Sequence, residues 1–238
     1  MKISVIIPTL NEERVIGRTL EGIKAQEFEG ELEIIVADGN SSDKTVKIAK
    51  KHGAKVVTEK TNTISAGRQA GAEIATGEVF LYTDADVIVQ KGWIANIAKA
   101  FEDKEVMGAY GWIVPHRGGS LEVFLLKYSA LIVAHISSLI GMDYLAGSNM
   151  AVRATAFRKI GGMNIKLTTG EDTDLIKRVR KVGKVVFVPS AIIKYSLRRI
   201  RDWGYPKYLM FHTKNYFSSH LLGKPADKYG AIRDKKKE

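Results

Sequence analysis

The chain has 238 residues, 45% of them hydrophobic, and a formal net charge of +11 at pH 7. These values predict one large domain with a sizeable core, and the positive charge indicates an anionic partner such as a phosphorylated ligand, nucleic acid or a membrane surface. The absence of cysteine excludes disulfides, thiolate metal sites and a cysteine nucleophile. No signal-peptide layout precedes the first strand-like run, so we expect a cytoplasmic protein.

Short apolar runs alternate with helical patterns through the first third of the chain. Strands are predicted over residues 3–7, 32–37, 54–58 and 79–83, with helices between them. Pro8 ends the first strand, and Asn11 is expected to cap a helix whose first turn carries Glu12 and Glu13. This alternation predicts βαβ units, an α/β fold and a mostly parallel, doubly wound sheet flanked by helices. No Gly-x-Gly-x-x-Gly fingerprint follows the first strand.

Two carboxylates one residue apart, Asp84 and Asp86, follow the strand at 79–83. Right-handed crossovers bring strand ends to one edge of a parallel sheet, so we expect Asn11 and Asp38 at the same edge. A divalent cation compensates such adjacent negative charges and prefers oxygen ligands. Asp-x-Asp triplets also occur by chance in loops, so this triplet alone is weak evidence of a metal site.

The middle of the chain contains one segment that raises a membrane question. After a predicted helix over 93–101 and a strand over 107–114, residues 123–140 are mostly apolar, but Lys127 and His135 interrupt the run. A membrane-spanning helix needs about 20 apolar residues, so a core helix is the favoured interpretation. A helix that faces an interface or an acceptor, and a true span, are the alternatives.

A glycine and an acidic pair, Gly170, Glu171 and Asp172, open a later predicted helix. Acidic residues at a helix start interact favourably with the positive end of the helix dipole, and this effect alone explains much of the pattern. A carboxylate held at such a position can also act as a catalytic base. The residues themselves leave both interpretations open.

The segment from residue 194 onward differs in composition from residues 1–193. It holds 12 basic and 4 acidic residues, interleaved with aromatic residues between Trp203 and Phe217. We expect residues 1–193 to form the main domain and residues 194–238 to form a basic, aromatic segment, in part helical, with a disordered lysine-rich end. Such a segment suits a helix that covers the core, an anionic membrane surface or, less well, nucleic acid.

Five short motifs follow one another along the chain. They are Pro8-Thr9-Leu10-Asn11-Glu12-Glu13, Ala37-Asp38-Gly39-Asn40-Ser41-Ser42-Asp43, Ala66-Gly67-Arg68, Asp84-Ala85-Asp86 and Gly170-Glu171-Asp172. Each is weak alone, but their order and spacing over residues 3–190 resemble those of the family 2 inverting glycosyltransferases, which have the GT-A fold. The resemblance implies transfer of a sugar from a nucleotide-diphosphate donor, typically a UDP-sugar, to a hydroxyl or phosphate acceptor by metal-assisted single displacement.

The resemblance also implies roles for individual residues. Asp172 would be the general base and Glu171 would support the acceptor. Asp86, with Asp84 as an alternative or second ligand, would bind Mg²⁺ or Mn²⁺. Arg198 and Arg199 would contact phosphates of the acceptor or the donor. The donor nucleotide would be bound by Pro8, Thr9, Glu12, Asp38, Arg68, Asp84 and Ala85.

Two features depart from the family pattern. Many relatives supply a metal-ligating histidine after the strand that corresponds to 185–189, but residues 193–199 contain none. The Gln-x-x-Arg-Trp motif of processive synthases is also absent. A sugar-phosphate nucleotidyltransferase and a non-catalytic module that binds nucleotide sugars or membranes therefore stay open as functions. Peripheral association with the inner face of the membrane, with an acceptor such as a polyprenyl phosphate, depends on whether the basic segment binds lipid.

Overall fold

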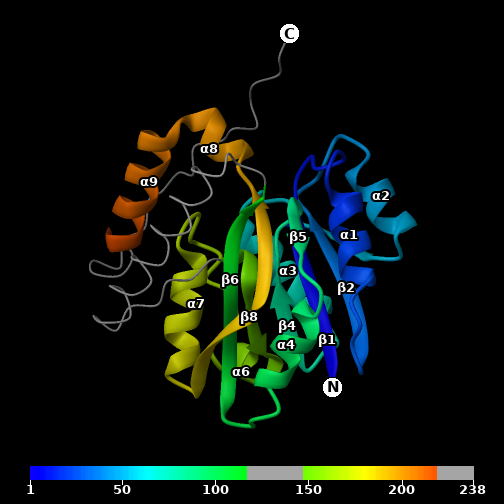
Figure 1. Cartoon of the computed structure of the whole chain (residues 1–238), viewed down its shortest axis with the longest axis vertical. Coiled ribbons are helices and arrows are strands. Elements are labelled where there is room, and N and C mark those ends of the chain that lie inside the picture. Colours follow the sequence, from blue (N-terminus) through cyan, green and yellow to red (C-terminus); the bar gives the residue numbers. More distant parts are fainter. Residues whose placement is uncertain (117–146, 219–238) are drawn as a thin grey trace.

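The computed structural model of the chain describes residues 1–116 and 147–218 (Figure 1). Six side chains within the second range are outside the description, those of Arg198, Arg199, Asp202, Leu209, Tyr216 and Phe217. The apolar helix predicted over residues 123–140 and the lysine-rich end after residue 218 also lie outside the described residues.

Strands and helices alternate along the described chain. The strands are β1 (Lys2–Thr9), β2 (Glu31–Asp38), β3 (Lys55–Thr58), β4 (Val79–Tyr82), β5 (Val87–Val89), β6 (Val106–His116), β7 (Met150–Arg153) and β8 (Lys184–Ser196). The helices are α1 (Ile16–Lys24), α2 (Thr45–Lys51), α3 (Ile64–Ile74), α4 (Trp93–Ala100), α6 (Ala154–Lys159), α7 (Glu171–Arg180), α8 (Arg198–Trp203) and α9 (Tyr205–Phe217), with a 3₁₀ helix, η1 (Gly147–Asn149), before β7.

The strands form one eight-stranded sheet in the order β3-β2-β1-β4-β7-β6-β8-β5. β1 to β4 pair in parallel, as expected for βαβ units, and β6 is parallel to β8. β7 is antiparallel to β4 and β6, and β5 is antiparallel to β8. β1 to β4, β6 and β8 therefore end at one edge of the sheet, towards the top of Figure 1, and β5 and β7 begin there.

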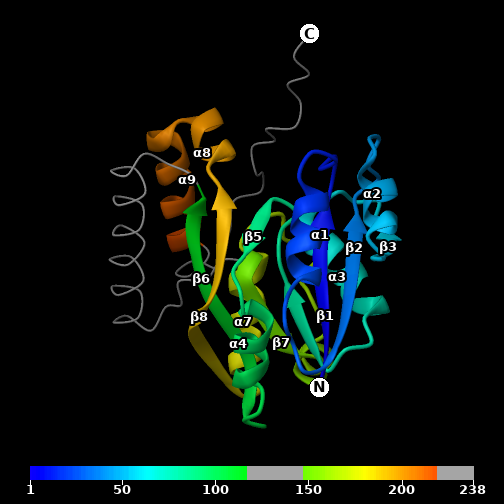
Figure 2. The same ribbon diagram turned by 45° about the vertical axis from the view of Figure 1, so that its right-hand side comes forward.

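Helices cover both faces of this sheet because side chains alternate along its strands. On β1, Ile3, Val5 and Ile7 belong to a buried cluster that includes residues of α1, α2 and α4. Ile6 points to the other face and belongs to a second cluster with residues of α3, α6 and α7. The two helical layers can be followed in Figure 2. Two covered faces are what a doubly wound α/β sheet requires, so the predicted fold class is confirmed.

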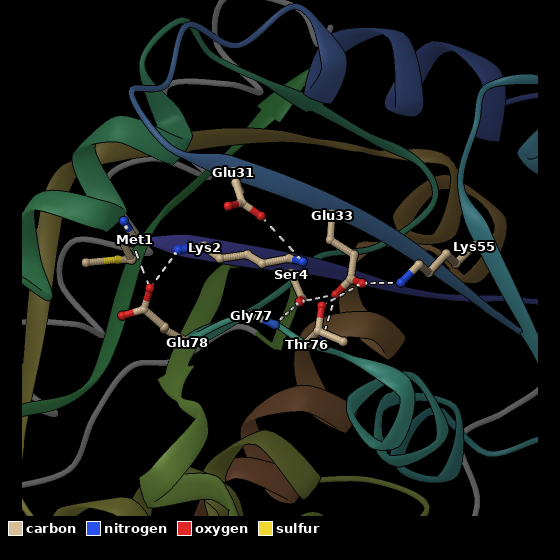
Figure 3. A network of polar contacts seen from close by, with 9 residues as sticks. All are labelled: Met1, Lys2, Ser4, Glu31, Glu33, Lys55, Thr76, Gly77 and Glu78. Atoms are coloured by element: carbon tan, nitrogen blue, oxygen red, sulfur yellow. Dashed lines mark hydrogen bonds and ion pairs between the residues drawn. The ribbon is translucent and has the colours of Figure 1, made fainter.

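A buried carboxylate connects the first three strands away from the edge where they end (Figure 3). Glu33 on β2 is 7% exposed and accepts hydrogen bonds from Ser4 Oγ at 2.5 Å, Lys55 Nζ at 2.5 Å and Thr76 N at 2.9 Å. Ser4 Oγ in turn accepts from Gly77 N at 2.9 Å. Burial alone would raise the pKa of Glu33, but the hydrogen bonds from Lys55, Ser4 and Thr76 outweigh burial and lower the pKa to about 2.

The structure differs from the sequence prediction at the first helix. α1 begins at Ile16, and Asn11 lies in the preceding loop with a φ of 54°. Asn11 Oδ1 accepts a hydrogen bond from Ser42 N at 2.9 Å, so the prediction that Asn11 caps this helix is wrong. The loop after β2 supplies a partner that is 31 residues away, and a local capping rule takes no account of such a partner.

Two strands at the far side of the sheet also differ from the prediction. β5 was not predicted, because its three residues are too few to show a period. β8 has 13 residues and continues through residue 194 to Ser196, where it pairs with both β6 and β5. The C-terminal segment predicted from residue 194 therefore begins as sheet and continues as α8 and α9.

Candidate active site

The acidic residues of the sequence motifs gather at the sheet edge where β1, β2 and β4 end. Thr9 and Asp38 are the last residues of β1 and β2 and are opposite one another in the register. Asp84 and Asp86 lie between the end of β4 and the start of β5. Glu171 is the first residue of α7, and its contact with Arg68, which also contacts Asp84, brings the start of α7 to this edge.

Asp38 is held in one orientation by its own loop. Its side chain is buried; Oδ1 accepts from Ser41 Oγ at 2.6 Å and from Thr9 Oγ1 at 3.3 Å, while Oδ2 accepts from Ser41 N at 2.8 Å. The loop after β1 is tied to the same region, since the N–H of buried Glu12 donates to Thr45 Oγ1 at 2.8 Å. The ends of β1 and β2 thus form one hydrogen-bonded platform.

The turn that carries Asp84 and Asp86 is anchored from α1. Thr19 Oγ1, which is buried, lies 2.7 Å from the carbonyl oxygen of Ala85 and 2.9 Å from that of Val87. The Ala85 side chain is also buried and packs in the core cluster beneath the turn. The two aspartates on either side of Ala85 remain partly exposed. The turn therefore presents two carboxylates from a fixed backbone.

A buried ion pair joins this turn to the start of α7. Arg68 on α3 is 2% exposed, and its Nη1 donates to Glu171 Oε1 at 2.7 Å while its Nη2 lies 3.5 Å from Asp84 Oδ1. Burial and the neighbouring Asp172 carboxylate raise the pKa of Glu171 to about 7, and Arg68 opposes this rise. Arg68 thus links the turn after β4 to the first residue of α7.

The second acid of the pair is held by backbone groups. Asp172 Oδ2 accepts from the N–H of Gly147 at 2.9 Å, and Oδ1 accepts from the N–H of Thr173 at 2.7 Å. Gly170, the residue before α7, has a φ of 68°, a left-handed conformation that glycine adopts at little cost. The helix start predicted at Gly170-Glu171-Asp172 is confirmed.

Asn149, at this edge, is a structural residue that no sequence motif singled out. Asn149 in η1 accepts from Trp93 Nε1 at 2.8 Å and donates to the carbonyl oxygens of Trp112 and Ala191 at 2.8 and 2.9 Å. Asn149 therefore fixes η1, and with it the N–H of Gly147 that binds Asp172. The only sign of this role in the sequence is a polar residue just before a short strand.

The two aspartates of the turn fit a hard cation that takes its other ligands from a diphosphate and water, because carboxylate oxygens suit Mg²⁺ and Mn²⁺. Within residues 1–116 and 147–218, no three His, Asp, Glu or Cys side chains are grouped to hold a metal ion by themselves. Residues 193–196 of β8 carry no histidine, but His116 at the end of β6 is paired with Ser196. This position of His116 beside β8 depends on the pairing of β6 with β8, which the sequence does not reveal.

Other predicted features are placed only in part. The backbone of Arg198 and Arg199 lies in the first turn of α8, immediately after β8, but their side chains are outside the described part of the chain. Among the residues that the structure describes, no helix is both long and apolar enough to cross a bilayer.

Comparison with known proteins assigns this arrangement to a family. The sequence profile of Glycosyl transferase family 2 matches residues 4–161, more than half of the chain. The chain belongs to glycosyltransferase family 2. It is similar to "Probable glycosyltransferase YdaM" of Bacillus subtilis, with 28% identity over 209 residues that make up 80% of this chain and 50% of that protein. It is also 35% identical over 111 residues to the poly(ribitol-phosphate) beta-N-acetylglucosaminyltransferase TarS of Staphylococcus aureus, covering 44% of this chain and 19% of TarS. The chain thus spans half or less of the length of these two relatives.

Solved structures share the fold of this family 2 chain. The mannosyltransferase PcManGT from Pyrobaculum calidifontis, solved with GDP-Man and Mn²⁺, has a TM-score of 0.68 at 18% identity, over 89% of this chain and 64% of that one. Glucosyl-3-phosphoglycerate synthase from Mycobacterium tuberculosis, solved with Mn²⁺, UDP and glucosyl-3-phosphoglycerate, has a TM-score of 0.66 at 19% identity, over 97% and 83% of the two chains. The GT-A fold that the motifs implied is confirmed.

Proposed function

We propose that this family 2 member is an inverting glycosyltransferase that moves a sugar from a nucleotide-diphosphate donor to a hydroxyl or phosphate acceptor. The placement of Asp172 carries the proposal. Two backbone N–H groups hold its carboxylate, and it lies within electrostatic range of the same Arg68 that contacts Asp84. A fixed carboxylate close to the acids that bind the donor is what a single displacement requires of its base.

In this mechanism the acceptor oxygen attacks the anomeric carbon while Asp172 takes the proton of the acceptor. The bond to the nucleoside diphosphate breaks on the opposite face of the sugar, so one displacement inverts the anomeric configuration. Hydrogen bonds from Gly147 N and Thr173 N to the two carboxylate oxygens hold this base in one orientation. Glu171, beside Asp172, would support the acceptor. Mg²⁺ or Mn²⁺ bound by Asp86, with Asp84 as a second ligand, would neutralise charge on the leaving diphosphate.

The donor nucleotide is assigned to the platform formed by β1 and β2. Asp38 is buried with its carboxylate fixed by Ser41, and a carboxylate oxygen has lone pairs left to accept an N–H from a base. Uracil offers one such donor and guanine offers several. TarS has been solved with UDP and PcManGT with GDP-Man. We favour a UDP-sugar and regard GDP as the nucleotide to test beside it.

Calorimetric titration with UDP and GDP is the first test. Wild-type protein is expected to bind one diphosphate in the presence of Mn²⁺, and Asp86→Ala is expected to weaken this binding by at least the roughly 10- to 100-fold that disturbing a metal site costs. Asp103→Ala, which alters an exposed aspartate near Lys184, is the matched control and should bind as wild type does. Absence of binding by folded wild-type protein would contradict the proposal.

Two other functions make different predictions. A sugar-phosphate nucleotidyltransferase would need a basic, glycine-rich phosphate loop after β1, whereas the loop from Leu10 to Val15 carries Glu12 and Glu13 and no glycine. A non-catalytic nucleotide-sugar or membrane-binding module would bind the diphosphate without turnover, so Asp172→Asn would have no turnover to lose.

The acceptor side of the proposal includes a membrane surface formed by α8 and α9. The α8–α9 surface, as we use the term, consists of the exposed residues Arg201, Tyr205, Lys207, Met210 and Lys214. Met210 is 69% exposed, which places an apolar side chain among basic ones. Thr169 Oγ1 donates to Asn215 Oδ1 on α9 at 3.2 Å, so α9 lies close to the acidic pair at the start of α7. We propose that this segment, the first part of an accessory region over 194–238 beside a transferase domain over 1–193, brings the site to an anionic lipid surface.

Vesicle co-sedimentation tests the α8–α9 surface. Binding to vesicles rich in anionic lipid, and not to neutral vesicles, is expected to fall about 10-fold or more in the double variant Lys207→Glu/Lys214→Glu, because each basic residue near the surface contributes about 1 kcal/mol. Lys47→Glu/Lys50→Glu on α2 changes the net charge equally at exposed positions and should bind nearly as wild type does. Equal losses in both double variants would show a non-specific effect of net charge and contradict the membrane proposal.

A further inference from the structure

Arg68 reaches the active-site edge because α3 lies unusually close to the sheet. The sequence Ala66-Gly67-Arg68-Gln69-Ala70-Gly71 is rich in small residues. A Cβ on Gly71 would lie 2.4 Å from Ile6 Cγ2 on β1, and one on Gly67 would lie 3.2 Å from Pro8 Cβ. Only glycine allows this approach at position 71. The close packing brings the Arg68 side chain under the ends of β1 and β4.

The guanidinium of Arg68 is enclosed by protein groups. A Cβ on Gly147 would lie 2.5 Å from Nη1 and 2.6 Å from Nη2, so η1 packs directly against it. Nη1 donates to Glu171 and Nη2 contacts Asp84, residues that are 103 and 16 positions away in the sequence. Within the described residues, Nε has no hydrogen-bond partner and Arg68 as a whole is 2% exposed. A side chain so enclosed has little surface left to offer a nucleotide.

We propose that Arg68 is a positioning residue that acts through Asp84 and Glu171 and does not bind the donor itself. Its guanidinium fixes the aspartate that opens the donor-side turn and the glutamate that stands beside the base, and so sets the distance between the two halves of the site. This inference rests on the proposed transferase function. It replaces the role that the resemblance implied for Arg68, which was contact with the base or the diphosphate.

An arginine suits this role better than a lysine. The planar guanidinium presents several N–H donors in a fixed fork and so can contact two carboxylates at different places at once. The ammonium group of lysine is a single charge on a flexible stem. Arg68→Lys therefore keeps the buried positive charge but gives up the fixed geometry between Asp84 and Glu171, which makes it a test of positioning rather than of charge.

The test compares UDP and GDP binding with Mn²⁺ and in excess chelator at high nucleotide concentration. If Arg68 acts through Asp84, Arg68→Lys should leave metal-free affinity within about 2-fold of wild type and reduce the gain produced by Mn²⁺ by about 10-fold, in the range seen when groups around a metal site are changed. Arg178→Lys is the control, because Arg178 pairs with Asp174 on α7 at 2.7 Å, and it should change neither quantity.

Each outcome decides between the alternatives. A loss of about 10-fold or more in metal-free affinity would show that Arg68 contacts the donor, and no change in either condition would show that it positions nothing; both would overturn the inference. If Arg68→Lys does not fold, Gly147→Ala is read by the same criteria, since its new Cβ displaces the guanidinium without altering a charged group. Failure of wild-type protein to bind either nucleotide would instead overturn the proposed function on which the inference rests.

Discussion

Asp172→Asn is expected to lower turnover of the donor by about 10³-fold, within the range that general-base catalysis contributes. The amide cannot accept the acceptor's proton, but its oxygen can still accept a hydrogen bond from Gly147 or Thr173, so the local backbone should persist. Diphosphate affinity is expected to stay within about 2-fold, because Asp172 acts on the acceptor side. The measurement is steady-state turnover of the nucleotide sugar selected by the binding screen, beside calorimetry with the diphosphate.

Asp174→Asn is the matched control for this variant. Asp174 is two residues further along α7 and pairs with Arg178 of the same helix at 2.7 Å. Loss of the Asp174 carboxylate is expected to leave turnover within about 2-fold, since a partly exposed ion pair between neighbouring turns of a helix contributes on the order of 0.5 kcal/mol to stability. In Asp172→Asn, the removal of one of the two adjacent negative charges of Glu171 and Asp172 should not lower the melting temperature of the protein. Retention of turnover in Asp172→Asn would remove Asp172 from the role of base.

Glu33→Gln is expected to destabilise the fold by about 3 kcal/mol at pH 7, the free energy that corresponds to a pKa of about 2 in the folded protein against 4.5 for an unperturbed carboxyl. The glutamine would lose the charge that pairs with Lys55 and would place an amide donor against the donors of Ser4 and Thr76. Unfolding by urea, followed by circular dichroism, measures the difference.

The contribution of Glu33 to the stability of the fold is expected to fall as the pH falls. Its pKa is lower in the folded protein than in the unfolded chain, so the unfolded chain binds more protons between the two values and stability falls as pH falls. The contribution is complete above about pH 4.5 and declines towards pH 2, and the gap between wild type and Glu33→Gln should narrow over that window. Turnover per folded molecule should be unchanged, because Glu33 is remote from the active-site edge.

Glu31→Gln supplies the comparison for Glu33. Glu31 is two residues earlier on the same strand, its side chain is 79% exposed, and its ion pair with Lys2 has a separation of 3.6 Å. An exposed pair of this kind contributes at most about 1 kcal/mol, so this variant should unfold nearly as wild type does, at pH 7 and at pH 3 alike. Similar losses in Glu31→Gln and Glu33→Gln would show that burial of Glu33 carries no particular stability.

The placement of the carboxylates at one edge could be predicted from the sequence. Apolar runs separated by helical patterns located β1, β2 and β4, and the right hand of βαβ crossovers required Asp38 and Asp84 to meet at the ends of those strands. The helix start at Glu171 was equally visible, because a glycine followed by acids is a local signal. Strand periods, turn residues and helix starts depend on a few neighbouring residues. Such features therefore form in any tertiary structure that buries the apolar face of the strand or helix.

The partners of these residues were decided only by the tertiary structure. Asn11 has the residue type of a helix cap, yet it bonds to Ser42 of another loop. β5 has three residues and is a strand only because β8 continues past residue 194 and pairs with it. Arg68 turns to Glu171, 103 residues away, because two glycines let α3 settle against β1 and η1 closes over the guanidinium. Hydrogen-bond partners that are distant in the sequence depend on which surfaces pack together, and the local pattern of residues does not determine that packing.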